Sequence, residues 1–254
     1  MKTLVLIQMV PDLVEELVVD RDGTRLDPYS IHWVINEFDD FALEQAVLLK
    51  ERQGGEVIVV APAVEGVEDV LFTAAAKGAD LLIQLNGDFE GEVNNHSLAR
   101  QFFPLITQLK PDLILTGVSA HHRHDGALGA LIAALADLPY IGYVAGVTVT
   151  DGKAVARKEY PGGVICEMEV QLPAVLGIQS SDMPPRYVPI SKIRQAMKTA
   201  QIEEQEAGRA DLSGGVAISR LIQPQVSGHA VMLEGDLEQI AEKLVAIFKE
   251  QGVL

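Results

Sequence analysis

The chain has 254 residues, 48% of them hydrophobic, which is enough for one large α/β domain or for one domain with appendages. Its formal net charge of −16 argues against nucleic-acid binding, because affinity for a phosphate backbone comes mainly from clustered Lys and Arg. A single cysteine, Cys166, excludes both a disulfide framework and a cysteine-rich metal site within one chain.

The first half of the chain alternates apolar runs with segments of helical spacing. Such runs are typical of parallel strands covered on both faces. Asn36 fits the N-cap of the first helix, because Asp39 and Asp40 follow in its first turn. This alternation, with right-handed crossovers, predicts an α/β fold with a doubly wound, mostly parallel sheet and helices on both faces. In chain order we expect a strand over 5–9, a hairpin or extended excursion over 15–27, a helix over 36–53, a strand over 56–61, a helix over 64–77, a strand over 81–85, a helix over 95–110 that Pro104 kinks or starts, a strand over 113–116, and a helix that begins between Gly126 and Gly129.

The pattern changes after Pro139. Two strand-like stretches flank Asp151-Gly152, and Gly162-Gly163 leads into a third stretch with alternating apolar residues. Turn residues between such stretches predict an antiparallel hairpin extension. A buried strand over 173–178 follows.

From Ser180 the sequence is Pro-rich, and we interpret it as irregular. The stretch 201–228 has too few large apolar residues to build a core, so we expect an extended arm with few contacts to its own domain. The apolar residues of 236–251 fall on one face of an amphipathic helix. We therefore predict two parts, an α/β domain over 1–200 and a C-terminal arm and helix over 201–254.

One segment, from Pro111 to Pro139, combines a buried strand, a loop and a helix that opens from the loop. Ligands of open α/β sheets bind at such places, and the first turn of a helix favours an anion. Arg123, flanked by His122 and His124, could meet a phosphate through charge-assisted hydrogen bonds. The alternative is a solvated polar loop. We predict no metal site, because neighbouring loop histidines seldom converge without a carboxylate from elsewhere.

The stretch Asn36 to Asp39 is most simply a helix cap, but it also follows the first strand and can form a wall of the same crevice. There is no Walker loop, and no G-x-G-x-x-G follows the first strand. No spacing suggests a Ser-His-Asp arrangement, so we predict no catalytic residues.

No apolar run approaches the roughly 20 residues that are needed to span a bilayer. The N-terminus lacks a small-residue cleavage site and runs straight into the first expected strand, so we expect no signal peptide. A cytoplasmic location is the default expectation.

A series of short motifs in a fixed order spans nearly the whole chain. They are Val10-Pro11-Asp12, N-x-F-D at 36–39, A-x-x-x-G-A-D at 74–80, K-P-D-L-I-L-x-G at 110–117, Gly162-Gly163, L-P-A-V at 172–175 and P-R-Y at 185–187. In these motifs and their spacing the chain resembles the beta subunit of electron-transfer flavoproteins. The resemblance implies a Rossmann-like sheet of the adenine-nucleotide-binding type and a C-terminal arm that packs on a partner.

By this resemblance the chain is an electron carrier subunit and not an enzyme. Such a subunit forms a heterodimer with an alpha subunit, which mainly holds the redox FAD, and it carries electrons from flavin dehydrogenases to an acceptor such as a quinone reductase. The expected partners are thus an alpha subunit and a flavin dehydrogenase. The alternative, from another class, is an adenine-nucleotide-binding α/β module with a sensory or structural role and no electron transfer.

The family commonly holds AMP, or a second FAD in electron-bifurcating members, in the crevice of its central sheet. The family's phosphate loop typically has several Asp residues and then Gln-Thr or a similar pair before Gly, whereas this chain has His121, His122, Arg123, His124 and Asp125 before Gly126. The side-chain hydroxyl that would meet the phosphate is therefore lost. If a nucleotide is bound we expect AMP, with its phosphate contacted by Arg123 and the helix N-terminus in place of the missing hydroxyl. The crevice residues carried over are Leu6, Asn36, Glu37, Phe38, Asp39, Pro62, Gly117, Ser119, Ala120, Arg123, His124, Asp125, Gly126, Ala127, Leu128 and Gly129.

The family's dehydrogenase-recognition loop corresponds to residues 182–198, and its apolar anchor falls on Ile190. Ordinary core packing is the alternative for Ile190, but polar neighbours favour an exposed loop, where a lone apolar residue suits a binding hot spot. The recognition residues carried over are Pro185, Arg186, Tyr187, Pro189, Ile190 and Lys192.

Overall fold

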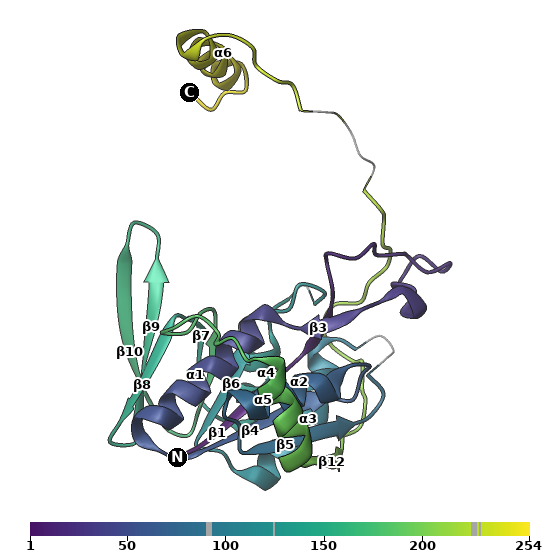
Figure 1. The fold of residues 1–254 in the computed structure, drawn as a ribbon, viewed down its shortest axis with the longest axis vertical. Coiled ribbons are helices and arrows are strands. Elements are labelled where there is room, and N and C mark those ends of the chain that lie inside the picture. The colour runs from purple at the N-terminus through teal and green to yellow at the C-terminus, as the bar shows by residue number, and fades with distance from the viewer. Residues whose placement is uncertain (90–92, 124, 225–227, 229) are drawn as a thin grey trace. The chain divides into compact units, whose positions relative to one another are not determined.

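A seven-stranded sheet forms the centre of the computed structural model (Figure 1). Every pair of neighbouring strands in this sheet is parallel. The prediction of a doubly wound, mostly parallel sheet is therefore confirmed. Across the sheet the strands are β12 (Ile202–Glu206), β5 (Leu81–Asn86), β4 (Glu56–Pro62), β1 (Lys2–Leu6), β6 (Leu113–Gly117), β11 (Ala174–Ile178) and β7 (Tyr140–Val144).

The structure describes residues 1–89, 93–123, 125–224, 228 and 230–254. The chain divides into two units, Met1–Leu221 and Ile222–Leu254. The first unit contains the central sheet, and the second contains the terminal helix. Across the described residues, no helix is long and apolar enough to cross a membrane.

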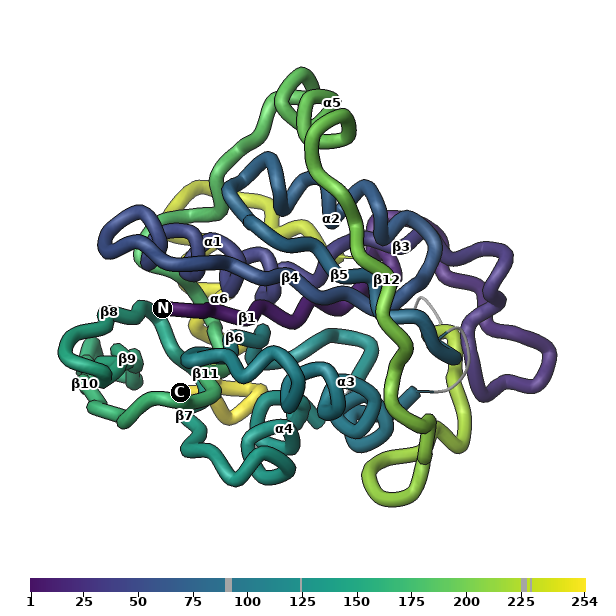
Figure 2. The backbone as a smooth tube through the Cα atoms, turned by 90° about the horizontal axis from the view of Figure 1, so that it is seen from below, coloured from purple at the N-terminus to yellow at the C-terminus, as the bar shows by residue number. Residues whose placement is uncertain are grey.

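Helices cover both faces of the central sheet (Figure 2). On one face lie α1 and α2, with α5 packed against α2, and on the other face lie α3 and α4. In β1, Val5 packs in the core on the α1 side, whereas Leu4 and Leu6 pack on the α3 side. Burial on both faces explains why the strand reads as an unbroken apolar run. The helices are α1 (Glu37–Gln53), α2 (Val67–Lys77), α3 (Asn95–Leu109), α4 (Leu128–Ala136) and α5 (Ile190–Thr199).

Two smaller antiparallel sheets accompany the central one. The hairpin extension predicted after Pro139 is confirmed by β8 (Gly146–Thr150), β9 (Lys153–Tyr160) and β10 (Val164–Gln171). Near the N-terminus, β2 (Met9–Pro11) pairs with β3 (Trp33–Ile35).

Two details of the predicted elements need correction. The chain first adds β7 to the central sheet, and Tyr143 at φ 58° turns it toward the hairpin. β7 was not expected from the sequence. Pro104 lies inside α3, which begins at Asn95, so this proline does not start the helix.

The Pro-rich stretch after Ser180 ends in a helix, where an irregular loop was expected. Pro189 occupies the N-cap of α5, a place that a proline tolerates because no intrahelical N–H bond is lost there. Ala196 is the buried residue of this helix. The prolines before it hid the helix start from sequence reasoning.

The segment expected to be an arm from Gln201 instead adds an edge strand to the central sheet. β12 pairs with β5 in parallel, and Gly208 N then donates to Gln101 O at 2.9 Å. The expectation of few contacts is therefore wrong for this segment, and the first unit extends to Leu221. The reason is that an edge strand is held by backbone hydrogen bonds and can carry polar side chains.

The amphipathic helix predicted over 236–251 is confirmed as α6 (Leu237–Glu250) in the second unit. Asp236 and Gln239 form a capping box at its start. Its apolar side chains Leu244, Val245 and Phe248 are exposed.

Candidate functional site

The central sheet changes its strand order between β1 and β6. From β1 the chain moves outward through β4 and β5 on one side, and later places β6 on the other side. Crevices at such switch points, at the carboxyl ends of the strands, are the usual ligand sites of doubly wound folds. The loops after β1 and β6 and the start of α1 meet there.

Asp39 is fully buried at this switch point and joins the two strands. Its Oδ2 accepts a hydrogen bond from Gln8 N at 2.8 Å, and its Oδ1 accepts one from Gly117 N at 2.6 Å. Burial raises the pKa of Asp39 to about 7, although both backbone hydrogen bonds favour the anion. Residue 117 must be glycine, because a Cβ there would lie 2.5 Å from Asp39 Oδ1. Asp39 therefore holds the loop after β1 and the end of β6 together at the bottom of the crevice.

Asn36 lies at the N-cap of α1, as predicted, but its side chain makes no capping hydrogen bond. Instead Asn36 Nδ2 donates to Ser119 O at 2.9 Å, in the loop after β6. The amide thus ties α1 to this loop. Glu37 is exposed and Phe38 is half-buried, with its Cβ packed against Gly117.

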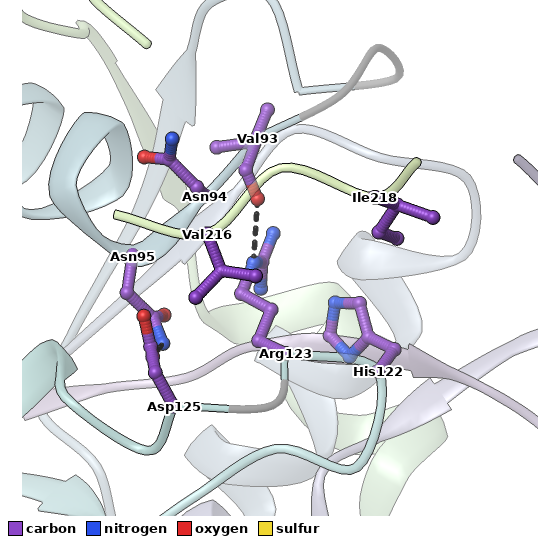
Figure 3. A pocket seen from close by; sticks show the side chains of 8 residues that line it. All are labelled: Val93, Asn94, Asn95, His122, Arg123, Asp125, Val216 and Ile218. Atoms are coloured by element: carbon purple, nitrogen blue, oxygen red, sulfur yellow. Dashed lines mark hydrogen bonds between the residues drawn. The ribbon is translucent and has the colours of Figure 1, made fainter. Parts of the chain in front are cut away.

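Arg123 points into the crevice (Figure 3). Its Nε donates to Val93 O at 2.9 Å and its Nη1 donates to the Oε1 of Gln8 at 2.6 Å. Burial lowers the pKa of Arg123 to about 10, against the opposing effect of the charges of Asp39 and Asp125. The guanidinium therefore stays cationic near neutral pH, and it links the loop after β1 to the segment before α3.

A carboxylate of the chain itself lies just before the N-terminus of α4. Asp125 Oδ1 accepts a hydrogen bond from Ala127 N at 3.1 Å, and it is also bonded by the side-chain amide of Asn95. Gly126, at φ 55°, makes the tight turn between them. An acidic group in this place suits the partial positive charge of the helix start.

The cavity beside Arg123 is small, with a volume of about 50 Å³. It is lined by Val93, Asn95, Arg123 and Asp125, and by Val216 and Ile218 from the segment after β12 (Figure 3). Ligand pockets for small molecules usually measure about 300–1,000 Å³. The cavity has room for a few water molecules and not for a nucleotide.

Two of the loop histidines are held by the β2–β3 ribbon. His121 Nε2 lies 2.9 Å from Pro11 O, and the ring of His122 meets the ring of Trp33 edge-on at 6.3 Å. His124 lies outside the described residues. In the part of the chain that the structure describes, no group of three His, Cys, Asp or Glu side chains is arranged to hold a metal ion.

Most of the remaining predicted crevice residues are buried, whereas Ser119 and Ala127 are half-buried. Leu6, Ala120 and Leu128 are buried among the apolar residues of the unit. Pro62 ends β4 and is buried, and Gly129 is buried beside Thr116, whose Oγ1 would lie 2.8 Å from a Cβ at this position.

Sequence reasoning missed Gln8, Val93 and Asn95, which bind Arg123 and Asp125. Gln8 carried one signal, because it is the single polar residue in the run Leu4 to Val10, and it is buried. The Val93 carbonyl gives no signal in sequence, since any residue supplies that group.

Four of the predicted recognition residues are exposed, whereas Pro185 and Arg186 are half-buried. Tyr187 and Ile190 are 85% and 65% exposed, and Pro189 and Lys192 are exposed beside them. Pro185 and Arg186 are half-buried, and Arg186 turns toward α1. The Arg186 guanidinium donates to Glu44 Oε1 at 2.8 Å and to Glu51 Oε1 at 2.6 Å.

Comparisons with known proteins agree along almost the whole chain. The family model of the electron transfer flavoprotein domain matches residues 26–210. The chain is 32% identical to an electron transfer flavoprotein subunit beta from Methylophilus methylotrophus, over 98% of each chain. It is 28% identical to the subunit of the same name from Bacillus subtilis, over 99% of each chain. It is also 26% identical to the caffeyl-CoA reductase-Etf complex subunit CarD from Acetobacterium woodii, over the full length of both. The chain therefore belongs to the electron-transfer flavoprotein beta subunit family.

Proposed function

We propose that this subunit forms a heterodimer with an alpha subunit that mainly holds FAD, and that the heterodimer carries electrons from a flavin dehydrogenase to an acceptor such as a quinone reductase. The observation that carries the proposal is the family membership over the full chain. In this proposal the subunit has no catalysis of its own and contributes binding surfaces. One relative is named as a subunit of a reductase complex, which supports a role in complexes of this kind.

Two exposed apolar surfaces suit the two proposed partners. In the second unit, α6 exposes Leu244, Val245 and Phe248, and helices with such a face are stabilised by docking on another protein. We propose that this helix and the segment before it dock on the alpha subunit.

The second surface, here called the α5 surface, consists of Tyr187, Pro189, Ile190 and Lys192. An exposed aromatic and an exposed aliphatic side chain beside a cation resemble the centre of a binding hot spot. We propose that the dehydrogenase binds the α5 surface.

The test is to isolate the subunit from its native source with whatever binds it. We expect a chain that contains FAD to co-purify, and the flavin absorbance to bleach when a flavin dehydrogenase and its substrate are added. An isolated, flavin-free homodimer that binds a nucleotide would contradict the proposal and support the sensory or structural module.

A further inference from the structure

The crevice at the sheet's switch point is occupied by the chain's own side chains. Arg123 crosses it, with one nitrogen on the Val93 carbonyl and another on the Gln8 side chain, whose residue is 2% exposed. If the guanidinium swung toward a ligand, both acceptors would lose their charged donor. Losing such a donor inside a protein is strongly unfavourable. The contacts therefore hold Arg123 in place as a plug.

The charges of the crevice are also balanced internally. Asp39 lies at the inner end, and Gln8 connects it to Arg123: the backbone N–H of Gln8 donates to Asp39 Oδ2, and the Oε1 of Gln8 accepts a hydrogen bond from Arg123 Nη1. At the outer end the Asp125 carboxylate accepts a hydrogen bond from Ala127 N, just before the first turn of α4. A phosphate arriving at this helix would meet a carboxylate, and like charges at close range repel.

A segment after β12 closes the outer side of the crevice. Arg100 Nη1 donates to Asp211 O at 2.8 Å and to Ser213 O at 2.7 Å. Asn94 Nδ2 donates to Gly214 O at 3.0 Å. These bonds fasten the segment to the start of α3, and Val216 and Ile218 follow it over the cavity (Figure 3).

We infer that this subunit closes the crevice with Arg123, Asp125 and the fastened segment, and that it folds and assembles without AMP. The residues do not fit the nucleotide's phosphate, because Arg123 is already bonded to the Val93 carbonyl and to Gln8, and the cavity beside it, which the Asp125 side chain also lines, measures about 50 Å³. Arg123 fills the space and Asp125 supplies the anion that a phosphate would bring. The inference concerns the crevice alone and does not depend on electron transfer.

The first test uses the full-length subunit isolated with its native partner. The complex is denatured, and the released nucleotides are separated and quantified against the protein. We expect less than a tenth of an equivalent of AMP per subunit. An AMP content near one equivalent overturns the inference. The FAD content of the same extract reports separately on the proposed electron carrier, so failure of one proposal is distinguishable from failure of the other.

The second test measures thermal unfolding of the same complex with and without millimolar AMP. We expect AMP to leave the melting temperature of the wild-type complex unchanged. Arg123→Ala should melt at least about 5 °C lower, because the buried Gln8 side chain and the half-buried Val93 carbonyl lose their charged donor. Arg21→Ala, which changes an exposed arginine in the same unit, is the matched control and should melt with the wild type.

The response of Arg123→Ala to AMP separates a plug from a ligand-binding residue. Stabilisation of the variant alone supports the plug, because removing the guanidinium opens the space. No stabilisation of either protein also supports closure, by Asp125 and the fastened segment. Stabilisation of the wild type that is lost in the variant overturns the inference. If the variant does not fold, the wild-type nucleotide content and melting experiment still decide.

Discussion

Replacing Arg186 with alanine should weaken the attachment of the α5 surface to the domain, although Arg186 is not itself part of that surface. The Arg186 side chain is held between Glu44, whose side chain is 2% exposed, and Glu51, whose side chain is 52% exposed. Its hydrogen bonds to Glu51 and Glu44 raise the pKa of Arg186, and the bond from Arg186 lowers the pKa of Glu51. The arginine thus anchors the segment that leads into α5 onto α1.

The magnitude follows from the burial of the two partners. Removing one member of a buried ion pair costs about 3–5 kcal/mol, because the other charge is left uncompensated. Here Glu44 keeps the hydrogen bond from the Arg186 backbone N at 3.0 Å, and the arginine side chain is 30% exposed. The exposed bond to Glu51 adds little. We therefore expect a loss of about 2–3 kcal/mol in unfolding free energy.

The assay is urea unfolding of Arg186→Ala, Arg186→Lys and the control Arg21→Ala, together with the dissociation constant for the dehydrogenase. Arg186→Ala should lose stability and dock more weakly, whereas Arg186→Lys should keep part of both, because it retains the charge and loses the bidentate geometry. A purely structural anchor would change stability and leave docking intact. Docking and stability both within about 0.5 kcal/mol of the wild type would refute the anchoring argument.

Three further outcomes are expected. Ile190→Ala should weaken docking of the dehydrogenase by about 1–3 kcal/mol with an unchanged melting temperature, because the side chain is 65% exposed; an equal loss of stability would place it in the core. Burial raises the pKa of Asp39 from 3.8 to about 7, so the folded state binds one more proton than the unfolded state between these values, and the unfolding free energy should fall as pH rises from about 4 to 7. Asp39→Asn should lack that slope, and equal slopes in urea titrations of both proteins would disprove the assignment. Truncation after Leu221 should leave the melting temperature of the first unit unchanged and should abolish co-purification of the alpha subunit. Truncation after Ala200 also removes β12 and should lower the melting temperature. If the chain truncated after Leu221 still binds the alpha subunit, α6 is not part of the interface.

The fold could be predicted well where burial sets the residue pattern. β1, β4 and β6 are covered on both faces, so their apolar runs are visible in sequence. The exposed helix α6 was predictable from its one apolar face. β12 escaped prediction because its sequence is mostly polar, and α5 escaped because a Pro-rich stretch leads into it. Their backbone pairing and packing depend on neighbours that are distant in sequence.

The candidate site was predictable in place but not in arrangement. Glycines and a helix start point to the loop after β6, and they lead to Arg123. The direction of the Arg123 side chain could not be predicted, because its hydrogen-bond acceptors, Gln8 and the Val93 carbonyl, are far away in sequence. The same residue types would suit a phosphate if the side chain faced outward.

The late position of β12 in the chain has a consequence during synthesis on the ribosome. β5 emerges early, and its outer edge stays unpaired until residues 202–206 have been made. An open strand edge can pair with other nascent chains, so this interval is a window for misassembly. Glu203, Glu204 and Glu206 make the strand that closes the edge strongly acidic. Their mutual repulsion between chains would discourage stacking of finished molecules at the same edge.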